Sequence, residues 1–325
     1  MEIIIAEATT LILINLASFI GNVLVALTMY KSRRLRTTST SNIYIFALAV
    51  LDLMWSTCVM PMAAIALLTG KWNFSGTVCE FQASIDYFVL YSSPATMGLA
   101  AFNRYMRIVK SKHYHKVFSL KKSRMFLAIF WLLLAMYIII VKITTWQRFE
   151  FLPDYALCVT KFSTKQSALI HYCITIPVCF VIPAFVIIFS YLHVYKTTRQ
   201  HNRNIFLTFH NRTNQTRLAI QEIRISRALF FVTAVFLVCW LPTWVIALVK
   251  RLQPTLTLHR SWKLVPVFLP FLSSAINPFI YAGNNPTFRS ELKRLFRMSW
   301  NCKRTIRLRP DAMELAYVEK HHKTN

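Results

Sequence analysis

Three residues that are costly or reactive at a membrane share one apolar helical stretch, Cys79–Lys110. Cys79 and Arg104 are about 25 residues apart, which is about 37 Å of helix and close to the depth of a bilayer with part of its headgroup regions. Asp86 lies about five helical turns before Arg104, so both side chains project from the same face. An ionisable residue at that depth is functional by default. The spacing indicates a protein that receives a signal at one membrane surface and delivers it at the other.

The composition shows which elements would hold these residues. The chain has 325 residues, of which 55% are hydrophobic and 15% are charged, whereas soluble domains carry about a quarter charged residues. We therefore predict an all-α membrane protein, with a seven-transmembrane helix bundle at 1–298 and a cytosolic tail at 299–325. The apolar segments long enough to cross a bilayer are 7–30, 43–68, 77–109, 124–146, 168–196, 222–250 and 262–283.

Basic residues predict the orientation of the bundle. The formal net charge is +26, and most of the 38 lysines and arginines fall in 31–36, 104–124, 196–227 and 289–323. These clusters occupy alternate connections, the positive-inside pattern of a polytopic membrane protein with its N-terminus outside and its C-terminus in the cytosol. The pattern argues against nucleic-acid binding and favours contact with anionic lipid. The segment Thr287–Met298 alternates apolar and basic residues, which predicts an amphipathic helix on the inner membrane surface.

Short motifs lie at matching depths in the predicted spans. In chain order they are Gly21-Asn22-Val23, Leu48–Asp52, Asn103-Arg104-Tyr105, Trp131, Pro183, Cys239–Pro242 and Asn277–Tyr281. Together they resemble the rhodopsin-like (class A) G-protein-coupled receptor family over about 15–298. The resemblance implies a plasma-membrane receptor that activates a heterotrimeric G protein and interacts with arrestin and a receptor kinase. It implies no enzyme, and the sequence shows no phosphate-binding loop and no nucleophile paired with a base.

The resemblance implies an activation switch in the cytosolic half. An ion pair between Arg104 and Glu222 would hold the third and sixth spans together at rest, and its loss would open a cavity for a G protein. The alternative for Arg104 is contact with lipid headgroups. Asn103 stands where the family commonly has an acid and cannot neutralise Arg104, so we expect some basal activity. The switch residues are Asn103, Arg104, Tyr105, Tyr191, Glu222, Phe236, Trp240, Pro242, Asn277, Pro278 and Tyr281.

A second polar group surrounds Asp52 at mid-depth in the second span. A carboxylate with hydroxyl and amide oxygens suits a small hard cation, so an allosteric Na⁺ with water is expected, and no other metal or cofactor. The alternative is a polar network that only binds the helices together. The residues that the family would bring around this site are Asn22, Asp52, Ser93, Ser273, Ser274 and Asn277.

Asp86 is the predicted anchor for the ligand. In receptors that the chain resembles, an acid about 10 Å below the outer surface pairs with a cationic amine or basic peptide. The alternatives are an internal ion pair, with Lys142 or Lys263, or a protonated carboxyl group. Aromatic walls also suit a cation, although aromatic residues in spans more often serve packing. The predicted ligand-binding residues are Asp86, Tyr87, Thr175, Cys179, Trp240, Trp244, Phe268 and Phe271.

Other features point to a mixed subfamily. Loop Leu152–Cys158 and the triplet Asn103–Tyr105 are similar to those of melatonin-like receptors, so a melatonin-like indole is the second hypothesis for the ligand. Phe271 stands where a retinal-binding opsin needs Lys and where amine receptors usually carry Tyr. A transporter or channel is the remaining alternative, and it is disfavoured because inverted repeats and a polar pathway are not seen.

The resemblance also implies a disulfide between Cys79 and Cys158, which the oxidising extracellular side permits. Asn73 begins an extracellular glycosylation sequon. Cys302 follows the predicted surface helix and is a candidate for palmitoylation. Pro94 replaces a commonly aliphatic residue that would pack with Pro183 and Phe236, so the relay between pocket and cytosol should be rebuilt here.

Overall fold

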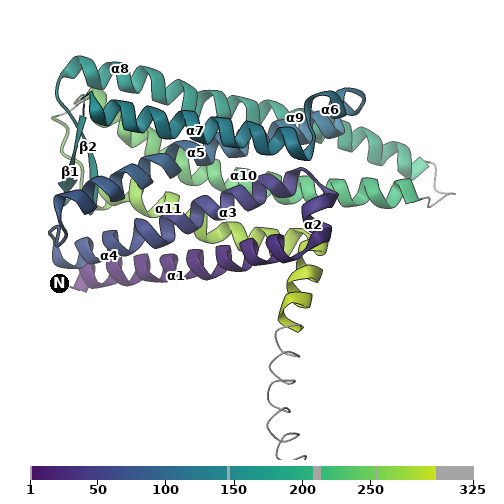
Figure 1. The fold of residues 1–325 in the computed structure, drawn as a ribbon, viewed down its shortest axis with the longest axis horizontal. Helices are drawn as coiled ribbons and strands as arrows, with labels where there is room; N and C mark the ends of the chain where they lie inside the picture. Colours follow the sequence, from purple (N-terminus) through teal and green to yellow (C-terminus); the bar gives the residue numbers. More distant parts are fainter. Residues whose placement is uncertain (1, 145–146, 208–213, 254, 298–325) are drawn as a thin grey trace, which may run out of the picture.

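The long helices of the molecule lie side by side along one axis (Figure 1). The computed structural model describes residues 2–144, 147–207, 214–253 and 255–297. Inside these ranges, the side chains of 38, 201–207, 214–229 and 251–252 lie outside the description. The predicted tail 299–325 and Cys302 also lie outside the described residues.

Seven membrane-length segments build the described bundle, as the apolar pattern predicts. Two short helices, α2 (Arg33–Thr38) and α6 (Ser111–Val117), lie in connections. The first segment begins at Glu2, five residues before the predicted start at 7. The long segments are α1 (Glu2–Lys31), α3 with α4 (Ser41–Cys58, Met60–Thr69), α5 (Gly76–Ile108), α7 (Leu120–Ile143), α8 with η1 and α9 (Lys165–Ile176, Pro177–Val181, Ile182–Leu207), α10 (Asn214–Leu252) and α11 (Arg260–Asn284).

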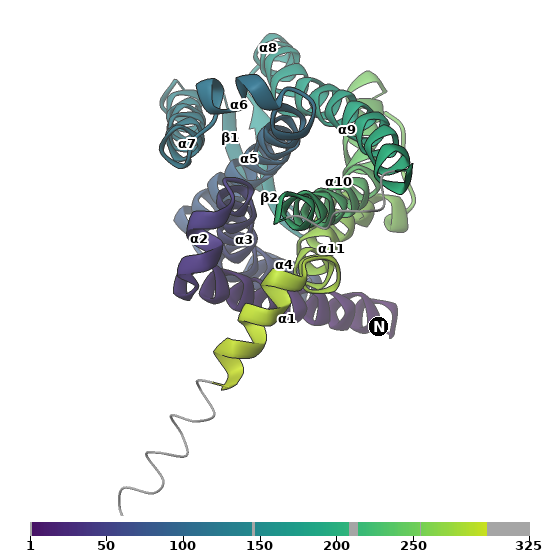
Figure 2. The same ribbon diagram turned by 90° about the vertical axis from the view of Figure 1, so that its right-hand side faces the viewer.

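Helix α5 differs from the others in composition. Among the described residues, six helical segments are long and apolar enough to cross a membrane, and α5 is not one of them. It carries Asp86 and Arg104 yet packs against α3, α7 and α9, which surround it in the view along the bundle (Figure 2). The polar side chains Asp86 and Arg104 therefore face neighbouring helices rather than lipid. Membrane proteins tolerate ionisable residues in the interior of a helix bundle.

Prolines alter the helices in different ways. Val59, with φ −122° and ψ −56°, separates α3 from α4 directly before the turn that holds Pro61. Pro177 begins the single π-turn η1 of the fifth span. Pro94 and Pro242 lie inside continuous α-helices. Because proline cannot donate a backbone hydrogen bond, each of these positions leaves a carbonyl to be satisfied by other groups.

A β-hairpin closes one end of the bundle. Strands β1 (Gln147–Leu152) and β2 (Leu157–Phe162) are antiparallel, with Phe151 opposite Cys158. The hairpin lies at the same end as the N-terminus, which we call the hairpin end, whereas α2 and α6 lie at the opposite end, called the α6 end (Figure 1).

A further helix, 286–297, follows α11 at the α6 end and turns across the bundle axis (Figure 1). Phe288 is buried on this helix, whereas Arg289, Lys293 and Arg294 are exposed. The predicted amphipathic helix is therefore confirmed over its described part. Its basic face suits anionic lipid at the membrane surface.

Gly21 marks the closest approach of α1 to α11. A Cβ atom at Gly21 would lie 2.7 Å from Cγ of Pro278. We expect Gly21→Ala to destabilise the purified protein by about 1–3 kcal/mol, because the proline ring cannot move aside without shifting its helix. Thermal unfolding in detergent measures this effect. Gly283→Ala is the control, because a Cβ at Gly283 would meet no atom within 4 Å; equal melting temperatures for the two variants would contradict the close approach.

Candidate functional site

Asp86 lies in the hairpin half of α5, less than two turns before the middle of the helix. The residue as a whole is partly exposed, and its Oδ1 accepts a hydrogen bond from Nε1 of Trp55 on α3 at 3.0 Å. Trp55 itself is 2% exposed. The structure thus holds a carboxylate in the interior of the bundle with a neutral donor beside it.

The two lysines that could have paired with Asp86 have other partners. Lys142 Nζ lies 2.7 Å from Glu80, and Lys263 Nζ lies 2.8 Å from Asp154. Within the described residues, no basic side chain forms an ion pair with Asp86. The predicted alternative of an internal pair with Lys142 or Lys263 is therefore wrong.

Aromatic rings extend from Asp86 into the core. The Trp55 ring stacks on Trp240 with 5.7 Å between centroids and contacts Phe271 edge-on at 5.2 Å. Trp240 in turn stacks on Phe236 at 4.7 Å. The structure therefore brings Asp86, Trp240 and Phe271 of the predicted ligand set together, with Trp55 between them.

The other predicted ligand residues form a second aromatic group. Trp244 stacks on Tyr91 at 6.5 Å and on Phe180 at 5.1 Å, and Tyr87 lies 5.8 Å from Tyr91. The Thr175 hydroxyl donates to a backbone carbonyl of its own helix at 2.8 Å. Cys179 is buried in the same hydrophobic core cluster as Trp244, and Phe268 is partly buried against that cluster.

Sequence reasoning missed Trp55, Tyr91 and Tyr137. His171 is 4% exposed and lies between two phenols, with Tyr137 Oη 2.8 Å from Nδ1 and Tyr91 Oη 3.1 Å from Nε2. The position of Trp55 inside the bundle could have been inferred from the sequence, because Trp55 follows Asp52 by less than one turn of the same predicted helix. The tyrosines come from α5 and α7, and no spacing within one helix reveals that they meet His171.

The hairpin is tied to α5 close to Asp86. Cys79 and Cys158 form a disulfide, so the predicted pairing is confirmed. Gln82 Oε1 accepts from the Cys158 backbone N–H at 3.0 Å. The Tyr87 hydroxyl accepts from the backbone N–H of Thr160 at 3.1 Å. These contacts fix strand β2 over the hairpin end of α5 on either side of Gln82.

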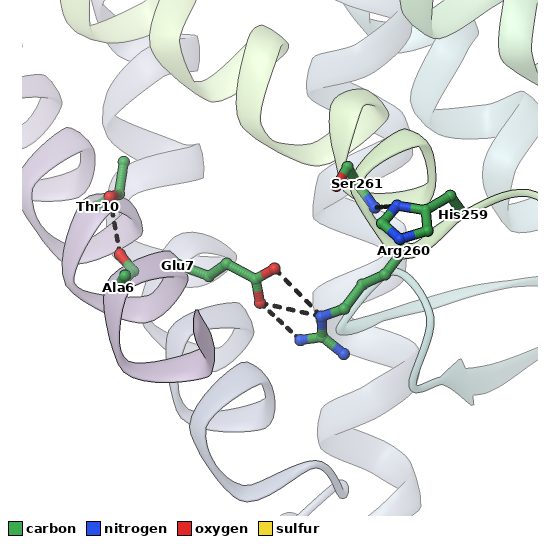
Figure 3. Close-up of polar contacts among 6 residues, drawn as sticks. All are labelled: Ala6, Glu7, Thr10, His259, Arg260 and Ser261. Carbon is green, nitrogen blue, oxygen red and sulfur yellow. Dashed lines mark hydrogen bonds and ion pairs between the residues drawn. The ribbon is translucent and has the colours of Figure 1, made fainter. Parts of the chain in front are cut away.

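Ion pairs at the N-terminus of α11 link it to two other elements. Arg260 donates from Nε and Nη2 to the Glu7 carboxylate of α1, with the shortest distance 2.7 Å (Figure 3). Lys263, about one turn further along α11, pairs with Asp154 in the hairpin turn. The hairpin end is therefore bounded by α1, α11 and the hairpin through side-chain charges as well as through the disulfide.

The predicted sodium site is buried in the middle of the bundle. Asp52 is 4% exposed and accepts from the Asn277 amide at 3.0 Å. The hydroxyls of Ser18 and Ser274 lie 2.8 Å apart, and the Asn22 amide donates to the Ser274 carbonyl at 3.2 Å.

Three of the predicted sodium-site residues have buried oxygens that remain to be satisfied. Within the described residues, Oδ1 of Asn22, Oδ1 of Asn277 and Oγ of Ser93 are buried without a hydrogen-bond partner. Ser273 is also buried, on the same helix as Asn277. Carboxylate, amide and hydroxyl oxygens are the ligands that a hard cation with bound water takes. The residues present therefore fit Na⁺.

Arg104 is fully buried at the α6 end, with 0% of its surface exposed. Its Nη2 donates to Oγ of Ser39 at 3.5 Å. Burial excludes the alternative in which Arg104 contacts lipid headgroups. The Glu222 side chain lies outside the described residues, so the predicted Arg104–Glu222 pair stays a prediction.

Asn103 has partners from two connections. Its Oδ1 accepts from the Thr40 and Ser41 hydroxyls at 3.2 and 3.0 Å, and its amide donates to the Tyr114 hydroxyl at 3.3 Å. Thr40 and Tyr114 are also hydrogen-bonded to each other. Asn103 therefore joins α5 to the start of α3 and to α6. These hydrogen bonds use both the oxygen and the nitrogen of its side-chain amide.

The remaining switch residues come from α5, α9, α10 and α11. Tyr105 contacts Phe189 at 5.3 Å. Gly98, one turn from Pro94, approaches Pro183, where an added Cβ would lie 3.4 Å from Cα. The buried members of the set are Tyr191, Phe236, Trp240, Asn277, Pro278 and Tyr281.

The predicted glycosylation residue Asn73 is exposed in the connection between α4 and α5, and its amide donates to the Thr69 hydroxyl at 2.8 Å. Its accessibility permits modification, and the glycosylation stays a prediction.

Comparisons with known proteins agree with this architecture. A family model described as "7 transmembrane receptor (rhodopsin family)" matches residues 21–281. Squid rhodopsin has a similar structure, with a TM-score of 0.77 and 20% sequence identity, covering 93% of this chain and 87% of that one. At that identity the likeness concerns the fold.

Two groups of receptors are similar in sequence. The melatonin receptor type 1B of Mus musculus is 26% identical over 304 residues, covering 92% of this chain and 80% of the relative. The histamine H2 receptor of Canis lupus familiaris is 26% identical over 311 residues, covering 95% of this chain and 84% of the relative. The chain is therefore similar over most of its length to both melatonin receptors and an amine receptor, in line with the mixed features of its motifs.

Proposed function

Because the chain belongs to the rhodopsin family of seven-transmembrane receptors, we propose that it binds a small extracellular cation and thereby activates a heterotrimeric G protein. The observation that carries the ligand class is the environment of Asp86. This residue is partly exposed, and its carboxylate accepts a hydrogen bond from Trp55 and has no ion pair among the described residues. A carboxylate in a low-dielectric site binds a cationic amine or a basic peptide strongly, since the pair forms away from competing water.

The α6 end supports G-protein activation. Arg104 is buried there and donates to Ser39, while Asn103 joins α5 to α3 and α6. The predicted Arg104–Glu222 pair would hold α10 against α5 at rest, and its loss would let α10 move outward and expose a cavity to a cytosolic partner. Arg104 and Tyr191 would then meet the G protein, and the same surface would serve arrestin and a receptor kinase.

A neutral indole is the second candidate ligand. It is favoured by the similarity to melatonin receptors and by the Asn103-Arg104-Tyr105 triplet. An amine is favoured by the similarity to histamine H2 receptors and by Asp86. The two candidates differ in charge, so the charge requirement of the response distinguishes them.

A ligand screen tests the proposal directly. The purified chain in lipid nanodiscs is mixed with each class of heterotrimeric G protein, and nucleotide exchange is measured with histamine, tryptamine, melatonin and short basic peptides as probes. We expect faster exchange with a cationic probe and no change with melatonin. Acceleration by melatonin alone would replace the amine with the indole, and ion flux without exchange would favour the transporter or channel class.

We also propose that Na⁺ binds at Asp52 and favours the resting state. The fit of Asn22, Ser93 and Asn277 oxygens supports the site. Replacing sodium with a bulky organic cation should then raise agonist affinity by about 5- to 150-fold, the usual range of allosteric coupling. Competition binding in the two buffers measures the ratio. Asp52→Asn should abolish the difference between buffers, and a variant that keeps it would remove Asp52 from the sodium site.

The location at the plasma membrane, with the hairpin end outside, is part of the same proposal. It is supported by the disulfide at the hairpin end and by the basic connections and basic surface helix at the α6 end. The exposed basic side chains of helix 286–297 suit anionic lipid of the inner leaflet.

A further inference from the structure

Trp55 occupies a junction between three helices of the core. Its indole N–H, which can only donate, points to Oδ1 of Asp86 at 3.0 Å. A hydrogen bond to an ionised acceptor is shorter and stronger than one between neutral groups. Trp55 is 2% exposed, so its indole is shielded from bulk water.

The Trp55 ring also contacts aromatic rings on α10 and α11. Trp55 is nearly parallel to Trp240, with 16° between the ring planes, and lies edge-on to Phe271 at 78°. Phe271 has no hydrogen-bonding group in its side chain, so Trp55 is the donor to Asp86 among the described residues. Packed interiors yield little to small displacements, so a shift of one indole is passed to the ring stacked on it.

Trp240 continues the contact toward the α6 end. It stacks on Phe236, which lies about one turn before it in α10, with 4.7 Å between ring centroids and 29° between ring planes. Both are 1% exposed. The carboxylate on α5 is thus joined to the middle of α10 by one hydrogen bond and two ring stacks, through a residue that belongs to neither helix.

From this geometry we propose that Trp55 is a positioning residue with two tasks. Its N–H orients the Asp86 carboxylate toward the cationic group of the ligand. Its ring transmits the position of that carboxylate to Trp240, so that ligand binding on α5 is felt on α10. The inference rests on the proposed function, in which Asp86 is the ligand anchor, and adds the residue that couples the anchor to the helix that moves.

Fluorine NMR of the ligand-free protein tests the coupling without any ligand. All 8 tryptophans are replaced by 5-fluorotryptophan, and resonances are assigned by single Trp→Phe variants. We expect Asp86→Asn to shift the Trp55 and Trp240 resonances by more than their line widths. The Trp131 resonance should stay, because the Trp131 indole nitrogen has no hydrogen-bond partner in the described residues and its ring contacts Phe88 instead.

A second background separates the relay from a general effect of the charge. In Trp55→Phe, which keeps a ring but removes the N–H, Asp86→Asn should no longer shift the Trp240 resonance. A Trp240 shift of the same size in that background would overturn the proposal, because the signal would then bypass Trp55. An unmoved Trp55 resonance in the parent protein would overturn it as well.

These outcomes are independent of the ligand screen. If Asp86→Asn abolishes the response to a cation but leaves both resonances in place, the proposed function stands and the role of Trp55 fails. If both resonances shift but no cation stimulates nucleotide exchange, the coupling stands, Asp86 loses its role as ligand anchor and the positioning task is overturned.

Discussion

Asp86→Asn is expected to weaken binding of a cationic agonist by at least about 30-fold, which corresponds to about 2 kcal/mol, because truncating one partner of a buried charge pair costs about 2–5 kcal/mol. The substitution preserves the size of the side chain and leaves an oxygen that can still accept from Trp55. Packing is therefore retained while the charge is lost. Radioligand or competition binding to membranes measures the ratio.

The matched control is Asp154→Asn in the hairpin turn. Its carboxylate pairs with Lys263 but is largely exposed, and an exposed ion pair contributes only about 0–1 kcal/mol. The control should therefore change affinity by no more than about 5-fold. Equal loss in the two variants would show that the cation senses the general field of the hairpin end rather than Asp86. Unchanged binding in Asp86→Asn would remove the anchor from the account.

Replacing both Cys79 and Cys158 by serine is expected to remove most correctly folded receptor from the cell surface. The bond joins segments separated by 79 residues, and loss of a native disulfide typically costs about 2–5 kcal/mol. In this protein it also releases strand β2, whose contacts with Gln82 and Tyr87 depend on the hairpin lying against α5. Agonist affinity in the surviving receptor should fall because Tyr87 loses its partner.

Antibody labelling of intact cells and ligand binding measure the two effects. The control is Cys173→Ser, because Cys173 is a free, exposed cysteine on α8. We expect the control to match the parent in both measurements. Parental surface level and affinity in the double variant would mean that the hairpin is held by its hydrogen bonds and by the Lys263–Asp154 pair alone.

Much of the architecture could be predicted because it depends on local physics. A membrane requires about 20 apolar residues for each crossing, so the spans appear in the sequence whatever their neighbours are. Segment 77–109 was predicted from its apolar length like the other spans, although α5 is not among the described helices that are long and apolar enough to cross a membrane. The disulfide between Cys79 and Cys158 was predicted because the receptor family that the chain resembles implies it at these positions.

The side-chain partners at the site could not be predicted, because they depend on how distant helices are rotated against one another. Lys142 and Lys263 were both candidates for Asp86, and only the folded structure shows that each has a nearer carboxylate. The Glu7–Arg260 pair joins residues at opposite ends of the sequence (Figure 3).

Asn103 also combines a feature that the sequence predicts with partners that only the fold reveals. The sequence reveals that an amide stands where an acid is common, and the chemistry of the amide follows at once. Its three partners come from the start of α3 and from α6, whose placement beside α5 is a property of the fold. The structure therefore replaces a missing charge interaction with a hydrogen-bonded junction.

The central claim is that an outer site at Asp86 and an inner end at Arg104 are two ends of one coupled element. Binding linkage tests this most directly, because a partner that binds the inner end must change affinity at the outer site by the same factor as the reverse. The measurement is the affinity of a cationic agonist for the purified chain with and without nucleotide-free G protein. The account predicts tighter binding by about 5- to 150-fold when the G protein is bound. Identical affinity in the two samples, with complex formation verified, would contradict it.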